Sequence, residues 1–182
     1  MNPSSRNRLI LIVLVALFAL PLFAAFALRS GGWQPHAVRS SGTLVDPPRD
    51  LSAVLTTLTD GSRYAWRDPH YRWTLLLLPG QQCGSLCRTR MDEALRMRIT
   101  LGRNADRLRV LYLGPALPEN FVAARAPLLA GRDDVGALAF AHARGDDALA
   151  VALVDPNAQL MLRYADGYSA QGLRSDIVKV IY

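Results

Sequence analysis

The sequence predicts an α/β domain with a mixed central sheet, preceded by one N-terminal transmembrane helix. Three observations support this class. A long apolar run lies near the N-terminus, from Leu9 to Leu28. Further along, two short apolar runs flank an amphipathic segment, which is the pattern of a strand, a helix and a strand. Later still, two strand-like runs are joined by Asp155-Pro156-Asn157, which is typical of a hairpin.

The first of these features is a membrane anchor. The segment from Leu9 to Leu28 reads LILIVLVALFALPLFAAFAL, 20 residues without a charge. A helix needs about 20 apolar residues to cross about 30 Å of hydrocarbon, and Pro21 is tolerated in a membrane helix. A cleaved signal peptide has an apolar core of about 7–15 residues; Ala25-Phe26-Ala27 imitates its cleavage site, but the core before it is too long. A small domain could not cover such a helix on all sides, so an anchor is favoured over a core helix.

The flanking charges predict the orientation of the anchor. Arg6 and Arg8 precede the apolar segment, and Arg29 alone follows it closely. The positive-inside tendency then places residues 1–8 in the cytoplasm and exports the rest of the chain. We therefore expect a single-pass protein of a bacterial inner membrane, with its C-terminal domain in the periplasm.

The basic composition does not indicate nucleic acid. The chain has 21 basic and 15 acidic residues, a net charge of +6. Three of the bases (Arg6, Arg8 and Arg29) flank the anchor, and the others are interspersed with acids as on a solvated surface. A phosphate-binding stripe is not evident, so we expect no nucleic-acid partner.

A linker is expected to follow the anchor. Residues 30–50 are rich in Gly, Ser and Pro, as in SGGWQP and SSGTLVDPPRD, a composition typical of linkers. The predicted division is therefore a linker over residues 29–50 and a folded domain over residues 51–182.

The folded part begins with a strand–helix–strand unit. Trp73–Leu78 and Leu108–Leu113 are short apolar runs of the kind found in strands buried on both faces. Between them, one helical stripe is formed by residues four apart, and Gly102 ends it: Cys87, Met91, Leu95 and Ile99. Two strands joined by a helix in this way form a parallel pair with a right-handed crossover.

The remaining elements complete the order of a thioredoxin-like fold. They are a helix starting at Pro118-Glu119 and ended by Pro127, a hairpin of Leu149–Val154 and Ala158–Tyr164, and an amphipathic helix over Ser169–Ile181. A parallel unit followed by an antiparallel hairpin and a helix is the thioredoxin arrangement, a central mixed sheet with flanking helices.

The chemistry of this chain is predicted to lie in its two cysteines. Cys83 and Cys87, spaced CxxxC, follow the first central strand and open the next helix. The N-terminus of a helix stabilises a thiolate, and two thiolates can hold a soft metal ion. Alternatives are a structural disulfide, which would stabilise little across so short a loop, and idle buried cysteines. Zinc is disfavoured because no second Cys or His pair completes four ligands.

The chain resembles the Sco/SenC family of membrane-anchored copper-binding proteins that assist cytochrome c oxidase assembly. The anchor, the strand TLLLLPGQQ, the CxxxC motif and the segment ALVDPNAQLMLRY carry the resemblance. It implies a Cu(I) site with Cys83, Cys87 and one histidine as ligands. Asp147 stands where the family has that histidine, so His142, the nearest histidine, is the candidate third ligand. Gly84 replaces the Pro that usually follows the first cysteine.

Three interpretations of the function follow from this resemblance and from the cysteines. The first is assistance to oxidase assembly, by Cu(I) delivery or by reduction of the copper-site cysteines of a partner, either a respiratory oxidase subunit or another periplasmic thiol protein. In the reductase version Cys83 is the attacking and Cys87 the resolving sulfur. The second is a generic thiol–disulfide oxidoreductase, although such enzymes favour CxxC and a Pro facing the cysteines. A non-catalytic thioredoxin-like interaction module is the third interpretation.

Overall fold

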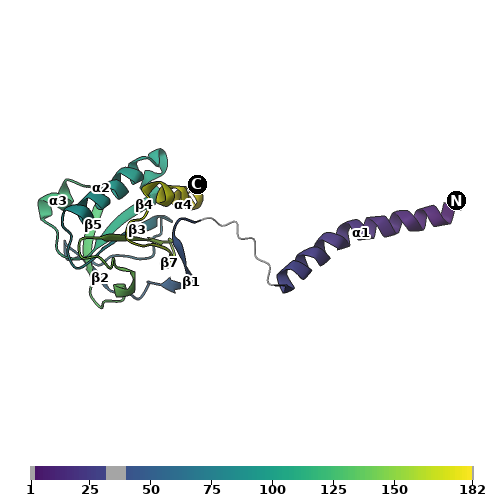
Figure 1. Ribbon diagram of the computed structural model, residues 1–182, viewed down its shortest axis with the longest axis horizontal. Helices are drawn as coiled ribbons and strands as arrows, with labels where there is room; N and C mark the ends of the chain where they lie inside the picture. The colour runs from purple at the N-terminus through teal and green to yellow at the C-terminus, as the bar shows by residue number, and fades with distance from the viewer. Residues whose placement is uncertain (1–2, 32–39, 182) are drawn as a thin grey trace. The chain divides into compact units, whose positions relative to one another are not determined.

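The computed structural model describes residues 3–31 and 40–181, which belong to two separate units. The first unit is one helix, α1 (Pro3–Ser30), in which Pro21 lies without ending the helix (Figure 1). Within the part of the chain described, α1 alone is long and apolar enough to cross a membrane, over the 23 residues Arg6–Leu28. The predicted segment Leu9–Leu28 falls inside this span, and the single apolar helix is confirmed.

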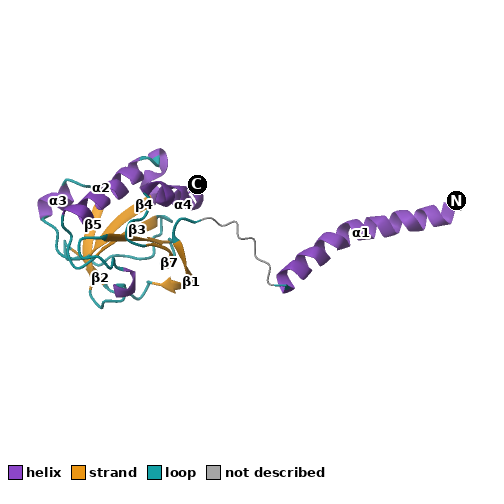
Figure 2. Cartoon of the chain, in the orientation of Figure 1, coloured by secondary structure: helices purple, strands orange, loops and turns teal. Residues whose placement is uncertain are grey.

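The second unit, residues 40–181, is built on one sheet with helices beside it (Figure 2). Its strands are β1 (Thr43–Asp50), β2 (Thr56–Leu58), β3 (Trp73–Pro79), β4 (Leu108–Leu113), β5 (Leu128–Asp133), β6 (Leu149–Val154) and β7 (Gln159–Tyr164). Its α-helices are α2 (Ser85–Ile99), α3 (Glu119–Ala123) and α4 (Ala170–Ile181). The strand order is β1-β7-β6-β3-β4-β5-β2.

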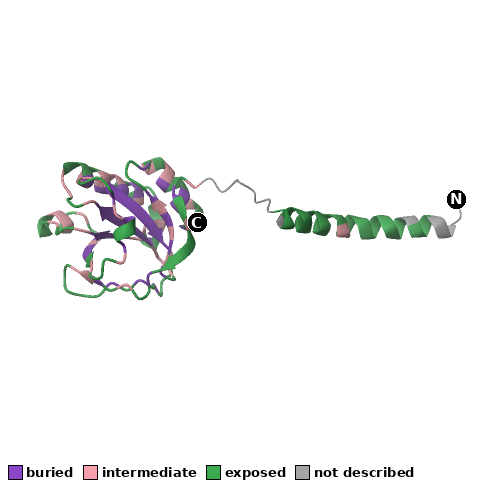
Figure 3. Cartoon of the chain, turned by 60° about the horizontal axis from the view of Figure 1, so that its bottom comes forward, coloured by how far each residue is buried: buried purple, intermediate pink, exposed green. Residues whose placement is uncertain are grey.

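The central strands form as they do because apolar side chains cover both faces of the sheet. β3 lies between β4, to which it is parallel, and β6, to which it is antiparallel. Leu75 and Leu77 face a core that contains Met91 of α2 and Leu173 of α4. On the opposite face, Leu76 belongs to a second core, in which residues from outside the strands such as Trp66 and Leu138 pack against the sheet. The sheet is therefore buried at its centre (Figure 3), and α2 and α4 lie on the same side of it.

The predicted thioredoxin-like order is confirmed, with one correction at its start. The strand–helix–strand unit, the hairpin β6–β7 and the closing helix α4 all lie where the sequence predicts them. The predicted linker over residues 29–50 is wrong in its second half, because β1 pairs with β7 and the domain begins at Ser40. At its other end, Arg29 and Ser30 belong to α1, and residues 32–39 lie outside the described residues. β1 has almost no buried side chains, and Pro47-Pro48 is tolerated because the strand is at the edge of the sheet.

The strands β2 and β5 were not predicted. β5 follows Pro127 directly, pairs in parallel with β4, and extends the sheet beyond the predicted unit. The helix before it, α3, has only 5 residues, so the chain between α3 and β6 is long enough to include a strand. Gly131 and Asp133 within β5 are typical of turns, and the sequence therefore does not predict a strand there. The carboxyl ends of β3, β4 and β5 meet at one edge, where the cysteines lie.

Candidate functional site

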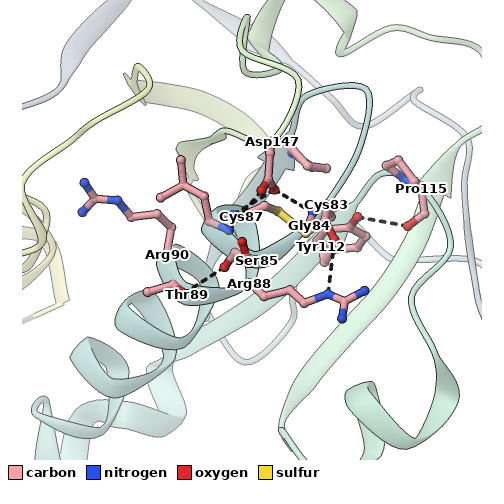
Figure 4. The surroundings of a disulfide bond; sticks show 12 residues. Cys83, Gly84, Ser85, Cys87, Arg88, Thr89, Arg90, Tyr112, Pro115 and Asp147 are labelled. Atoms are coloured by element: carbon pink, nitrogen blue, oxygen red, sulfur yellow. Dashed lines mark hydrogen bonds between the residues drawn. A yellow bond between two sulfur atoms is a disulfide. The ribbon is translucent and has the colours of Figure 1, made fainter.

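The cysteine pair sits where β3 ends and α2 begins. Cys83 and Cys87 form a disulfide with Cα atoms 5.0 Å apart (Figure 4). Cys87 belongs to the first turn of α2 and is 0% exposed, whereas Cys83 precedes the helix and is partly exposed. The two sulfurs are therefore unequal, since a partner can reach Cys83 but not Cys87.

A carboxylate occupies the N-terminus of α2 beside this disulfide. Asp147, from the loop before β6, accepts hydrogen bonds from the backbone N–H groups of Gly84 (2.6 Å), Leu86 (3.1 Å) and Cys87 (3.1 Å) (Figure 4). These bonds, above all that from Cys87, lower the pKa of Asp147, and the positive charge of Arg88 lowers it further. Asp147 is therefore ionised and caps the helix.

Two glycines allow the carboxylate to come so close. A Cβ atom on Gly84 would lie 2.7 Å from Oδ2 of Asp147, so a larger residue at position 84 would displace the side chain. A Cβ atom on Gly80 would overlap the carbonyl oxygen of Gly145. Instead, the N–H of Gly80 donates to the carbonyl of Ala148 at 3.1 Å. The loop after β3 and the loop before β6 are thereby held together.

The polar groups around the disulfide are engaged with the backbone. Arg88 Nε donates to the carbonyl of Cys83 at 3.2 Å, and the Arg88 guanidinium lies 5.3 Å from the centre of the Phe121 ring. The Tyr112 hydroxyl donates to the carbonyl of Pro115 at 3.0 Å. Burial raises the pKa of Tyr112, so this hydroxyl stays protonated at neutral pH.

The predicted copper ligands are not brought together. His142 Nδ1 lies 2.7 Å from the carbonyl oxygen of Pro79, and the ring lines a cavity of about 250 Å³ with Leu113 and Arg132. Over residues 3–31 and 40–181, no group of three His, Cys, Asp or Glu side chains is arranged to hold a metal ion. In this form the sulfurs of Cys83 and Cys87 are bonded to each other.

The residues present do not fit a three-ligand Cu(I) site. Cu(I) favours soft thiolate and imidazole donors, whereas Asp147, in the position where the resemblance predicts a histidine, offers a hard carboxylate that already accepts three hydrogen bonds. The resemblance marks Asp147 only as the position of a missing ligand and does not predict its capping role. Gly84 directly after the first cysteine was the available signal, since it leaves room for this side chain.

A thioredoxin-like sheet with a cysteine pair at the N-terminus of the helix after the central strand defines a thiol-oxidoreductase-like class of protein. The chain belongs to the family described as "Transmembrane-like, thioredoxin-like, C-terminal domain", whose model matches residues 73–181, more than half of the chain. A search of curated proteins finds no significant match.

Solved structures confirm the fold, and Sco proteins are among those that share it. Yeast Sco1 with copper bound is 14% identical, with a TM-score of 0.54 over 80% of this chain and 92% of that one. BsSco, described as a member of the Sco family of cytochrome c oxidase assembly proteins with a disulfide switch, is 12% identical, with a TM-score of 0.54 over 74% and 95%. A thiol:disulfide interchange protein DsbE from Chlorobium tepidum is 15% identical, with a TM-score of 0.52 over 78% and 97%.

Proposed function

We propose that this protein is a membrane-anchored periplasmic reductant that assists cytochrome c oxidase assembly by reducing the copper-site cysteines of a partner. The observation that carries the proposal is the unequal cysteine pair: a partly exposed Cys83 joined to a buried Cys87 at the first turn of α2. A carboxylate rather than an imidazole beside this pair favours thiol chemistry over resident copper.

The unequal burial of the two cysteines supports Cys83 as the attacking and Cys87 as the resolving sulfur. In the reduced protein, the Cys83 thiolate attacks one sulfur of the partner's disulfide, and the partner's other sulfur leaves as a thiolate that takes up a proton. Cys87 then loses its proton and attacks the Cys83 sulfur, which breaks the mixed disulfide and releases the partner's second thiolate. Two electrons pass to the partner, and the product is the Cys83–Cys87 disulfide seen in the structure. A thiol reductant must then restore the dithiol.

The anchor supports the same function. Disulfides form readily in an oxidising compartment such as the periplasm, so copper-site thiols exported there need a reductant at the membrane. α1 has the length and composition to hold the domain at the membrane surface, and the arginines before it favour a cytoplasmic N-terminus.

A trapping experiment tests the proposal. The reduced full chain in detergent is mixed with the oxidised copper-binding domain of a respiratory oxidase subunit, and mixed disulfides are resolved on a non-reducing gel. Cys87→Ser is expected to accumulate a mixed disulfide, because the resolving sulfur is absent. Cys83→Ser is the matched control and is expected to accumulate none. The proposal would be contradicted if the reduced wild-type protein left the partner's disulfide intact, or if both variants accumulated equal amounts of mixed disulfide.

Cu(I) delivery is the second candidate, because yeast Sco1, a structural neighbour, was crystallised with copper bound. Titration of the reduced full chain with Cu(I) separates the two functions. We expect weak binding that His142→Ala leaves unchanged, and a gain in affinity of at least tenfold for Asp147→His, which adds an imidazole beside two thiolates. One tightly bound copper in the wild type, lost in His142→Ala, would instead favour the delivery function and the predicted ligand set.

A further inference from the structure

The carboxylate at the start of α2 occupies the groups that a cysteine thiolate would use. The first N–H groups of a helix have no partner within the helix and attract negative charge. Here the N–H groups of Leu86 and Cys87, at the start of the 15-residue helix, already donate to Asp147. Both follow Cys83 by only a few residues, so a thiolate on Cys83 would compete with Asp147 for them.

We propose that Asp147 is the residue that sets the reducing power of the Cys83–Cys87 pair. Reduction takes up two electrons and two protons and converts the disulfide into two thiols. A site that stabilises a thiolate favours this reduced form and makes the disulfide oxidising. Asp147 acts in the opposite direction: it withholds the helix N–H groups from Cys83 and places a second negative charge beside it. The dithiol therefore gives up its electrons more readily, as the proposed reductase function, on which this inference rests, requires.

The local sequence is arranged to hold this carboxylate in place. Gly84 leaves the space that Asp147 fills, and the close approach at Gly80 holds the two loops together. The N–H of Gln82 also donates to the carbonyl of Asp146, at 3.0 Å. These contacts join the loop after β3 to the loop before β6, which carries Asp147. They therefore fix the position of the Asp147 carboxylate at the start of α2.

The other charged and titratable groups near the pair do not replace this effect. The guanidinium of Arg88, from α2, lies over the Phe121 ring. Its Nε donates to the Cys83 carbonyl oxygen (Figure 4). Tyr112 of β4 is neutral and donates to Pro115. From the loop before β6, Asp147 is the carboxylate bonded to the first turn of α2. Removing its charge should thus alter the chemistry of Cys83 directly.

The test is the redox equilibrium of the full chain in detergent with glutathione at pH 7. Asp147→Asn keeps the shape of the side chain and one acceptor oxygen but removes the charge. We expect the equilibrium constant for oxidation by glutathione disulfide to fall about tenfold, which corresponds to a reduction potential about 30 mV higher. The rate of Cys83 alkylation by iodoacetamide is expected to reach its plateau at lower pH than in the wild type.

Two further variants separate this effect from a general loss of structure. Asp155→Asn is the matched control, since Asp155 also accepts backbone N–H groups, those of Asn157 and Gln159, at the opposite end of β6. It should leave the potential unchanged. Gly84→Ala should shift the potential in the same direction as Asp147→Asn, because the added Cβ displaces the carboxylate.

The outcomes distinguish this inference from the proposed function. The role of Asp147 would be overturned if Asp147→Asn left the reduction potential unchanged or lowered it. It would also be overturned if Asp155→Asn raised the potential by the same amount. Because glutathione is the redox partner here, a shifted potential in a protein that fails to reduce the oxidase domain would support the role of Asp147 and refute the reductase function.

Discussion

Replacing Asp176 tests how the start of the domain is held to its last helix. This side chain is 3% exposed and belongs to α4. Its Oδ2 accepts hydrogen bonds from the backbone N–H groups of Ser41 (2.6 Å) and Gly42 (3.2 Å) and from the Tyr164 hydroxyl (3.1 Å). Lys179 donates to Oδ1 at 3.1 Å. One carboxylate thus joins the first residues of the domain, β7 and α4.

The expected cost of Asp176→Ala follows from the donors it leaves without an acceptor. The bonds from Gly42 and Tyr164 are buried, and that from Ser41 is part-buried. An orphaned buried donor costs about 1–3 kcal/mol, and water can partly satisfy Ser41, so the free energy of unfolding should fall by about 3–5 kcal/mol. Asp176→Asn keeps one acceptor oxygen and should cost about 1–2 kcal/mol.

The pH dependence gives a second readout of the same site. Burial raises the pKa of Asp176, but the hydrogen bonds from Lys179, Ser41, Gly42 and Tyr164 outweigh it, and the net pKa is lowered. A carboxyl whose pKa is lower in the folded state stabilises the protein above its ordinary pKa of about 3.9 and loses that contribution as pH falls through its folded value. The difference in stability between wild type and Asp176→Asn should therefore be full at pH 7 and vanish in acid.

Urea unfolding of the oxidised full chain in detergent, followed by circular dichroism, measures these differences. Lys179→Met is the control: Lys179 is 54% exposed, so its ion pair should contribute at most about 1 kcal/mol. A loss below about 1 kcal/mol in Asp176→Ala, or equal losses in the Ala and Asn variants, would refute the reasoning.

Two further substitutions test a buried ion pair and the close approach of two loops. The side chain of Asp68 is 1% exposed and forms ion pairs with Arg72 and with the mostly buried Arg109. Asp68→Ala leaves Arg109 without this partner and should lower the free energy of unfolding by about 3–5 kcal/mol. A loss under about 1 kcal/mol, measured by urea unfolding, would contradict this expectation. Gly80→Ala should separate the loops around Asp147, because its Cβ overlaps the carbonyl oxygen of Gly145. Its glutathione equilibrium should then shift in the same direction as that of Gly84→Ala, and an unshifted potential in a folded protein would show that the loops tolerate the change.

Much of the fold was predictable because it depends on local patterns. The apolar run Leu9–Leu28 lies within the helix α1, since length and composition alone decide whether a segment can span a membrane. β3 and β4 were predicted because strands buried on both faces read as continuous apolar runs. The edge strand β1 was missed, because its hydrogen bonds come from β7 and its own side chains are mostly exposed.

The candidate site divides in the same way. The sequence by itself determined that two cysteines would sit at the start of a helix behind a membrane anchor, because spacing and flanking elements are local properties. Only the tertiary structure decided that Cys87 is buried, that His142 turns to the Pro79 carbonyl oxygen, and that Asp147 caps α2. The hydrogen bonds of Asp147 and His142 join residues about sixty positions apart in the sequence. Such bonds depend on how distant loops approach each other in the folded chain, and no local sequence pattern predicts that approach.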